Sequence, residues 1–187
     1  ELANLCEKIG VNIQDISIGM GLDQRIGDRF LRAGPAYGGS CFPKDTRALI
    51  DVADKYKSDL SIVKSVIKSN NLRKITLTKR IDKILNNRLK NKNITFLGVT
   101  FKPNTDDMRE ASSIPMINYL NKKGSKIRYY DPSGRKKEFD RLKNVKFYSS
   151  ISSACIKSDL IIIHTEWNAF KLLDFKKLVK KKNFKVF

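Results

Sequence analysis

The second half of the chain alternates short apolar strands with helices, and this pattern restricts the fold more than any other feature. Strands are predicted at residues 93–99, 126–132, 145–150, 159–165 and 184–187, separated by helices at 112–124, 151–158 and 174–182. Such alternation is typical of a parallel sheet with right-handed crossovers. We therefore predict an α/β fold with a Rossmann-like parallel-sheet domain at 91–187, which would bind its ligand at the carboxyl ends of the strands.

The first half of the chain is predicted to be helical. Helical spacing of apolar residues indicates helices at 1–9, 12–20, 43–56 and 58–85. The last of these is long, and its broad apolar face has few other predicted elements to cover it. We therefore expect residues 1–90 to form a helical region that packs against a second copy of the chain.

The composition is strongly basic, with 38 Lys and Arg against 19 Asp and Glu and a formal net charge of +19. The lysines are spread along the whole chain, and no zinc-finger or RNA-binding aromatic signature accompanies them, so we expect a solvated basic surface and no nucleic-acid partner. Such a field favours small anions such as nucleotides. No apolar run approaches the length of a membrane span and no signal peptide opens the chain, so no membrane partner is expected.

Three cysteines are too few for a complete disulfide framework, and none has metal-ligand spacing to another cysteine or to the single histidine. The sequence therefore predicts a reduced, cytoplasmic protein without a metal site. Cys6 and Cys155 lie among apolar residues at helical spacing and are predicted core residues. His164, at the end of an apolar strand, is predicted to be structural.

Cys41 is different, because it lies in the stretch GGSCFPKD at residues 38–45. Pro43 suggests that a helix begins there and leaves Cys41 just outside its amino end. A thiolate is stabilised at such a position, beside Lys44, and the two preceding glycines let a ligand approach the backbone closely. Asp45 could act as a general base or could simply stabilise the first helical turn. The stretch therefore indicates a reactive cysteine.

The stretches GPAYGGSCFPKDTRAL and FLGVTFKPNTDDMREASS resemble the active-site cysteine motif and the carboxyl-terminal domain entry loop of the UDP-glucose dehydrogenases, in the UDP-glucose/GDP-mannose dehydrogenase family. RIGDRFLRAG, YYDP and TEWNAF fit the same family in the same order. The resemblance covers essentially the whole chain. It implies two-step oxidation of UDP-glucose to UDP-glucuronate with NAD, in polysaccharide biosynthesis. GDP-mannose or another nucleotide sugar is the alternative substrate.

The resemblance also implies roles for individual residues. Cys41 would be the nucleophile and Asp45 would help to activate water. Cys41, Phe42, Pro43, Lys44 and Arg109 would approach NAD, although Arg109 could equally be a surface ion-pair residue. The expected substrate-binding residues are Arg25, Arg32, Ala33, Gly34, Pro35, Ala36, Tyr37, Gly38, Phe101 and Lys102. Of these, Arg25 would reach the substrate of the neighbouring subunit of a homodimer.

The family also has an amino-terminal NAD-binding domain, which the resemblance does not include. Gly98, after the first predicted strand, is followed by VTFKPN and not by the G-x-G-x-x-G fingerprint of dinucleotide binding. We therefore expect the chain to be a fragment, comprising the central helical region (1–90) and the UDP-binding domain (91–187), and to be inactive alone. The alternative is a non-catalytic module that dimerises and binds a nucleotide or another polyanion.

Overall fold

The computed structural model describes residues 1–187, which form two compact units, Glu1–Gly34 and Pro35–Phe187. The first unit contains two short helices, α1 (Leu2–Ile9) and α2 (Ile13–Gly21). Gly10 ends α1 in a left-handed conformation, φ 72°, which glycine adopts without steric cost. The Asn12 side chain caps α2 by accepting a hydrogen bond from the Gln14 amide at 3.0 Å. Cys6 is buried, as predicted.

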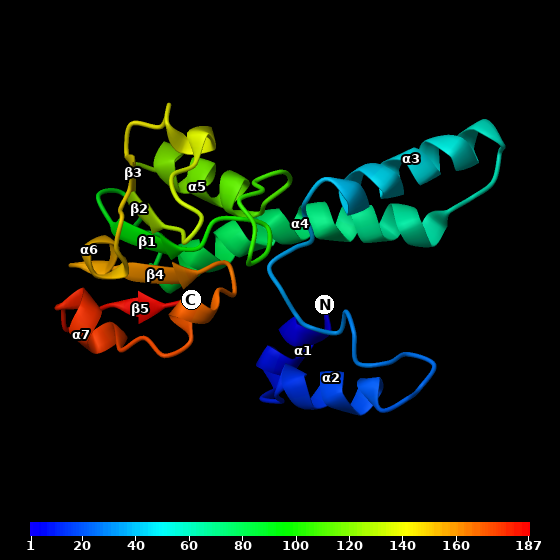
Figure 1. The fold of residues 1–187 in the computed structure, drawn as a ribbon, viewed down its shortest axis with the longest axis horizontal. Coiled ribbons are helices and arrows are strands. Elements are labelled where there is room, and N and C mark those ends of the chain that lie inside the picture. Colours follow the sequence, from blue (N-terminus) through cyan, green and yellow to red (C-terminus); the bar gives the residue numbers. More distant parts are fainter. The chain divides into compact units, whose positions relative to one another are not determined.

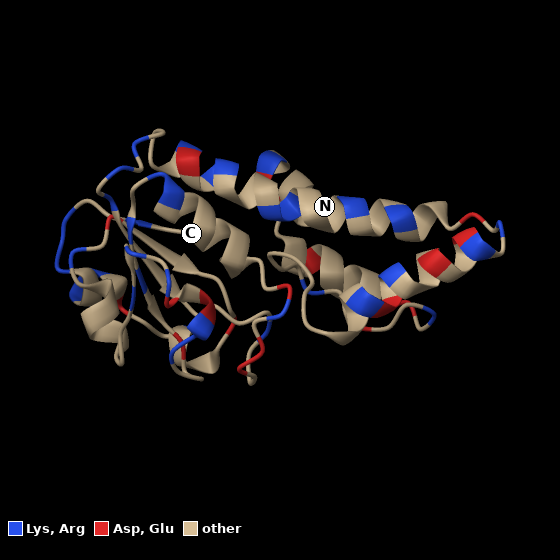
Figure 2. Ribbon diagram, turned by 90° about the horizontal axis from the view of Figure 1, so that it is seen from above, with Lys and Arg blue, Asp and Glu red and all other residues tan.

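The second unit begins with a helical hairpin of α3 (Cys41–Lys55) and α4 (Ser61–Ile84), which Figures 1 and 2 show projecting from the sheet. The amino-terminal half of α4 lies along α3, and its other half packs on α5 and the sheet. Helix α3 begins two residues earlier than predicted. Pro43 is tolerated as its third residue because amide groups of a first helical turn have no intrahelical partner.

The rest of this unit is a five-stranded parallel sheet in the order β3-β2-β1-β4-β5. The strands are β1 (Asn93–Leu97), β2 (Lys126–Tyr130), β3 (Val145–Phe147), β4 (Leu160–Ile163) and β5 (Lys185–Val186). The connecting helices are α5 (Ser113–Lys122), α6 (Ile151–Cys155) and α7 (Phe175–Val179), with two 3₁₀ turns at Lys137–Phe139 and Asn168–Phe170. The Rossmann-like α/β prediction is confirmed. The predicted strands extend one to three residues beyond the observed ones.

Apolar side chains that alternate between the two faces of the sheet form an apolar core on each face. Ile94 and Phe96 of β1 join Ile81 of α4 and Leu120 of α5 in one core. Leu97 faces the other core, with residues of α6, α7 and β4. Side chains of successive strand residues point to opposite faces, so a continuous apolar run is buried on both sides. None of the helices is long and apolar enough to cross a membrane.

Candidate functional site

The turn before Cys41 is packed tightly against the loop that follows β1. The Gly39 amide donates a hydrogen bond to the Arg109 carbonyl at 2.7 Å. A Cβ atom on Gly38 would lie 2.7 Å from the Glu110 carbonyl oxygen, and one on Gly39 would lie 2.8 Å from the Phe101 ring. Gly39 also has a φ of 83°, in the left-handed region. The two glycines are therefore required for this close approach.

Cys41 is the first residue of α3, and its thiol is exposed. The sequence prediction that placed Cys41 outside the helix was therefore wrong. Ser40 occupies the N-cap position without a side-chain capping bond, and its hydroxyl lies 3.6 Å from the Cys41 Sγ. The next turn carries an exposed ion pair in which Lys44 Nζ lies 3.3 Å from an Asp45 carboxylate oxygen. The thiol thus lies at the amino end of a helix, open to solvent and ligands.

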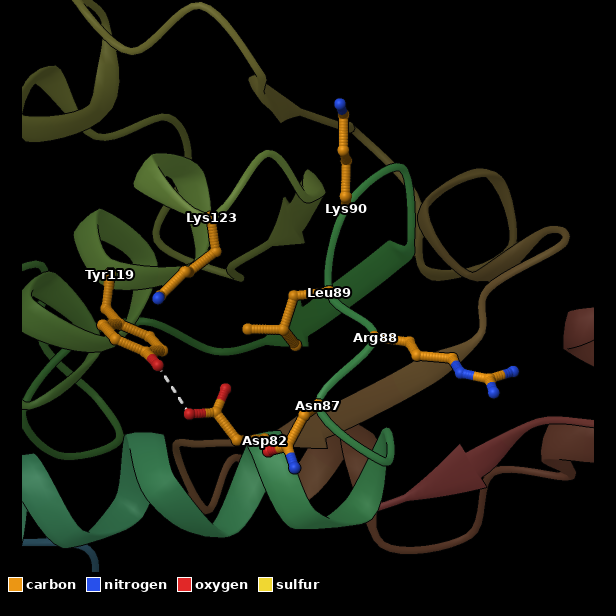
Figure 3. A pocket seen from close by; sticks show the side chains of 7 residues that line it. All are labelled: Asp82, Asn87, Arg88, Leu89, Lys90, Tyr119 and Lys123. Atoms are coloured by element: carbon orange, nitrogen blue, oxygen red, sulfur yellow. Dashed lines mark hydrogen bonds between the residues drawn. The ribbon is translucent and has the colours of Figure 1, made fainter.

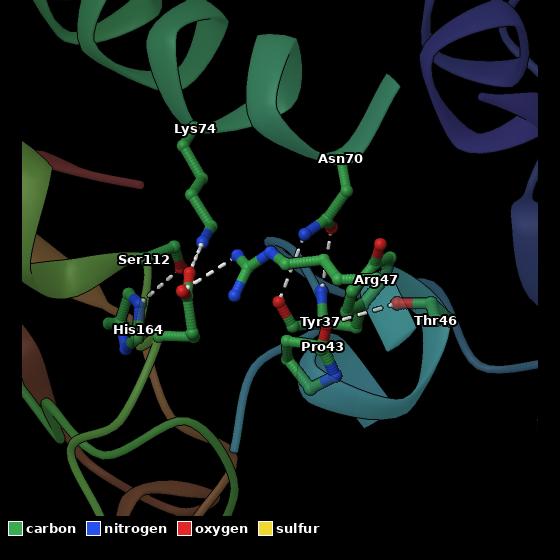
Figure 4. A network of polar contacts seen from close by, with 9 residues as sticks. Tyr37, Pro43, Thr46, Arg47, Asn70, Lys74, Ser112 and His164 are labelled. Carbon is green, nitrogen blue, oxygen red and sulfur yellow. Dashed lines mark hydrogen bonds and ion pairs between the residues drawn. The ribbon is translucent and has the colours of Figure 1, made fainter. Parts of the chain in front are cut away.

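Helix α4 fixes the segment that leads into this turn (Figure 4). The Asn70 side-chain oxygen accepts from the Tyr37 amide at 3.0 Å, and its side-chain nitrogen donates to the Tyr37 carbonyl at 3.1 Å. Arg73 Nε donates to the Pro35 carbonyl at 3.2 Å. The Tyr37 ring meets Phe42 edge to face, with ring centroids 4.8 Å apart. Residues 35–42 therefore have a defined path, which periodicity alone did not predict because Asn70 lies within a long helix and no local pattern marks it.

The loop after β1 carries the other predicted contact residues of this unit. Lys102 Nζ lies 5.4 Å from the centroid of the Phe101 ring. The Arg109 guanidinium binds Asp107 through Nε at 3.0 Å and Nη2 at 2.8 Å, so the ion-pair role considered for it is present. The hydrogen bonds that Arg109 donates to Asp107, with a smaller attraction to Cys41, hold the pKa of Arg109 above its usual value. The Arg109 backbone also borders the turn that leads to Cys41, because its carbonyl accepts the Gly39 amide.

A buried polar network supports this loop at the carboxyl ends of β1 and β4. The Ser112 hydroxyl lies 2.8 Å from His164 Nε2, and Thr165 Oγ1 donates to the Thr100 carbonyl at 2.8 Å. Ser112 occupies the N-cap position of α5, but its side chain bonds His164 and does not cap the helix. Gly98 has a φ of 75°, and a Cβ there would lie 2.5 Å from the Thr165 Cβ. Glycine is therefore required at this turn, both for its backbone conformation and for its packing against Thr165.

Four of the predicted substrate-binding residues belong to the first unit: Arg25, Arg32, Ala33 and Gly34. Arg25 donates to the Asp23 carboxylate at 2.6 and 3.0 Å. The structure therefore brings together Pro35 to Lys44, Phe101, Lys102 and Arg109 within the second unit. Arg25 and the three other residues of the first unit are not part of this group.

A separate pocket of about 420 Å³ lies beyond the carboxyl ends of α4 and α5 (Figure 3). It is lined by Asp82, Asn87, Arg88, Leu89, Lys90, Tyr119 and Lys123. The Tyr119 hydroxyl donates to the Asp82 carboxylate at 2.5 Å. Because α5 returns from the carboxyl edge of the sheet, its last residues lie at the amino edge. None of the predicted site residues lines this pocket.

Comparison with known proteins gives two family matches in chain order. Residues 1–72 match the central domain of the UDP-glucose/GDP-mannose dehydrogenase family, and residues 95–187 match its UDP binding domain. The chain is 47% identical over 181 residues to the UDP-glucose 6-dehydrogenase of Rickettsia typhi, and 40% identical over 178 residues to that of Rhizobium meliloti. These alignments cover 95% of this chain but only 42% and 41% of the two relatives.

Solved structures show the same fold. A UDP-glucose dehydrogenase from Pyrobaculum islandicum matches with a TM-score of 0.82 and 30% identity, over 89% of this chain and 39% of that one. A GDP-mannose dehydrogenase from Pseudomonas aeruginosa matches with a TM-score of 0.69 and 24% identity, over 98% of this chain and 43% of that one. The sequence motifs, the sheet order and both domain matches agree: the chain belongs to the UDP-glucose/GDP-mannose dehydrogenase family.

Proposed function

We propose that the chain supplies the cysteine nucleophile and the UDP-binding domain of an NAD-dependent UDP-glucose 6-dehydrogenase. The observation that carries the proposal is the exposed Cys41 thiol, presented by a diglycine turn that packs against the loop after β1. Ligands of open parallel sheets bind at this edge. The names of the most similar curated relatives support UDP-glucose as the substrate.

The thiol explains how one site oxidises an alcohol twice. After the first oxidation, the Cys41 thiolate adds to the aldehyde carbon, and the oxygen takes up a proton to give a thiohemiacetal. Loss of a hydride from that carbon and of the hydroxyl proton leaves a thioester. Water then adds, the carbon–sulfur bond breaks, and the carboxylate, the Cys41 thiol and one proton are released. When bound, NAD supplies the hydride acceptor, one molecule for each oxidation.

The charged residues around the thiol suit these steps. Asp45 is proposed to activate the hydrolytic water, and its exposed carboxylate lies beside Lys44, one turn of α3 after Cys41. Lys44 and Arg109 are exposed cations on the two segments that meet at the Cys41 turn. Cations in this arrangement fit the negative charge of a dinucleotide. We assign the approach to NAD to Arg109 and to Cys41 through Lys44.

The substrate contacts are assigned to the two segments that meet beside Cys41. Phe101 offers a flat apolar surface and Lys102 a charge at the carboxyl edge of the sheet, where the nucleotide is proposed to lie. The segment from Pro35 to Gly38 is proposed to wrap the sugar. Arg25, Arg32, Ala33 and Gly34 complete the proposed set, with Arg25 serving the neighbouring subunit.

The domain organisation is proposed as a helical dimerisation region at 1–90 and a UDP-binding domain at 91–187. Exposed apolar residues on α3 and α4, among them Leu49, Val52 and Val66, support homodimer formation through these helices. A cytoplasmic location is supported by three free cysteines. No membrane or nucleic-acid partner is proposed, because Lys and Arg are dispersed over the hairpin and the loops around the sheet (Figure 2).

A substrate panel tests this proposal. Full-length enzyme containing this chain should form NADH with UDP-glucose, at two molecules per sugar, and much more slowly with GDP-mannose or a UDP-N-acetylhexosamine. The 187-residue chain alone should show no turnover, since it holds no dinucleotide-binding glycine turn. Preference for another nucleotide sugar would overturn the substrate assignment, and robust turnover by the isolated chain would overturn the fragment assignment.

The second candidate function is a non-catalytic module that binds a nucleotide or another polyanion through its positive field. The net charge of +19 favours it. Calorimetric titration separates the two candidates: a catalytic part should bind UDP-glucose in preference to inorganic polyphosphate, whereas a polyanion-binding module should bind polyphosphate more tightly and should lose that binding with added salt.

A further inference from the structure

Glu110 joins three elements of the second unit through its carboxylate. One oxygen accepts from Arg47 Nη2 of α3 at 2.8 Å, and the other accepts from Lys74 Nζ of α4 at 2.9 Å. Glu110 itself lies on the loop that follows β1. Lys74 is the more buried cation, with a side chain only 12% exposed. The carboxylate therefore ties both helices of the hairpin to this loop.

The backbone at Glu110 makes the contacts that shape the Cys41 turn. Its carbonyl oxygen fills the space that a Cβ on Gly38 would need, and the carbonyl of the preceding Arg109 accepts the Gly39 amide at 2.7 Å. Glu110 has a φ of 56°, a left-handed conformation that is strained for a residue with a side chain. Such a conformation persists where surrounding contacts hold it, and the two ion pairs are contacts of that kind.

The two cations favour the ionised form of the Glu110 carboxylate. Hydrogen bonds from Arg47 and then Lys74 hold the pKa of Glu110 below its usual value. Of the neighbouring acidic groups, Asp107 is engaged by Arg109. Arg47 and Lys74 both pair with Glu110 instead.

We propose that Glu110 is a positioning residue for Cys41: by binding α3 and α4 with its side chain, it holds the Arg109–Glu110 backbone against Gly38 and Gly39. The proposal rests on the proposed function only in assigning a catalytic consequence to this position. The path of the turn itself follows from the contacts.

Hydrogen–deuterium exchange tests, independently of activity, whether the Glu110 side chain holds the backbone at Gly38 and Gly39 in place. In Glu110→Gln the side chain loses its charge and replaces one of the two acceptor oxygens with an NH2 donor, so the peptide containing the Gly39 amide should exchange about 10-fold faster. The matched control is Asp54→Asn, which breaks another ion pair between α3 and α4, Lys64 Nζ to Asp54 at 2.9 Å, without touching the loop. Exchange at Gly39 should be unchanged in the control. Unchanged exchange in Glu110→Gln would overturn the proposal.

Steady-state kinetics of the full-length enzyme test the consequence for Cys41. Glu110→Gln should lower kcat about 10-fold or more, because displaced reacting groups cost rate, while KM for UDP-glucose changes by less than about 2-fold. Asp54→Asn should keep kcat. If both variants had a lower melting temperature and Glu110→Gln kept its kcat, Glu110 would have only a structural role.

Two further variants test the proposal if Glu110→Gln does not fold. Lys74→Met and Arg47→Met each leave Glu110 with one partner, so each should give a smaller increase in Gly39 exchange than Glu110→Gln. Normal exchange in both would overturn the proposal. If Cys41→Ser proved active, the proposed function would fail, but the exchange experiment would still decide whether Glu110 sets the turn.

Discussion

His164 shows how a single buried side chain acquires a defined protonation state. Thr165 Oγ1 donates to the Thr100 carbonyl, so toward His164 Nδ1, 3.1 Å away, it acts as the acceptor. Nδ1 then carries the proton, and Nε2 accepts from the Ser112 hydroxyl at 2.8 Å. Burial lowers the pKa of His164 to about 4. The ring is therefore neutral, and its burial and two side-chain hydrogen bonds fit the structural role predicted from its position at the end of an apolar strand.

This network predicts a pH-dependent stability. The folded pKa of about 4 lies below the ordinary value of 6.5, so the unfolded chain takes up a proton first as the pH falls. The free energy of unfolding should therefore decrease between pH 7 and pH 5, by about 2 kcal/mol from this residue. His164→Gln should lose that part of the decrease. Urea unfolding of both proteins at the two pH values measures it, and equal pH dependence would contradict the assignment.

At the scale of elements, the α3–α4 hairpin carries apolar residues that the second unit leaves exposed. The apolar positions Ala48, Leu49, Val52 and Ala53 have the helical spacing that predicted this helix, yet Leu49 and Val52 are 50% and 53% exposed, and of the four only Ala53 is buried. Spacing identifies an apolar face but not what covers it. A second copy of the chain is the proposed cover.

The proposed dimer can be tested by charge substitution on this helix. The purified chain should sediment at about twice its 21.4 kDa mass. Leu49→Glu with Val52→Glu should give monomers, because burying charge without a partner opposes association. Asp51→Lys is the matched control, since helical spacing places residue 51 away from these two. A monomeric wild-type chain, or a dimer unaffected by the double substitution, would contradict the proposed interface.

At the scale of the whole molecule, much of the architecture could be predicted from the sequence because it depends on local signals. Apolar runs between turn residues predicted all five strands, and Gly10 and Asn12 marked helix ends in the first unit. The start of α3 was predicted less accurately, because proline is tolerated throughout the first turn of a helix and not only at its first residue. Pro43 suggested a helix start, although α3 begins at Cys41.

The contacts that assemble the candidate site could not be predicted, because they join residues far apart in the chain. Asn70 binds the Tyr37 backbone, and Glu110 binds Arg47 and Lys74. Each of these residues is unremarkable within its own segment. The motif around Cys41 indicated the chemistry, whereas only the fold shows which side chains hold that motif in place.

The most direct test of the central claim is the turnover of Cys41→Ser in the full-length enzyme. Serine keeps the shape but is a poor nucleophile, so NADH formation from UDP-glucose should fall by about 1,000-fold or more while calorimetric UDP-glucose binding is retained. Cys155→Ser is the control, since this buried thiol, whose pKa burial raises to about 11, should affect melting temperature and not chemistry. Near-normal turnover in Cys41→Ser would contradict the covalent mechanism.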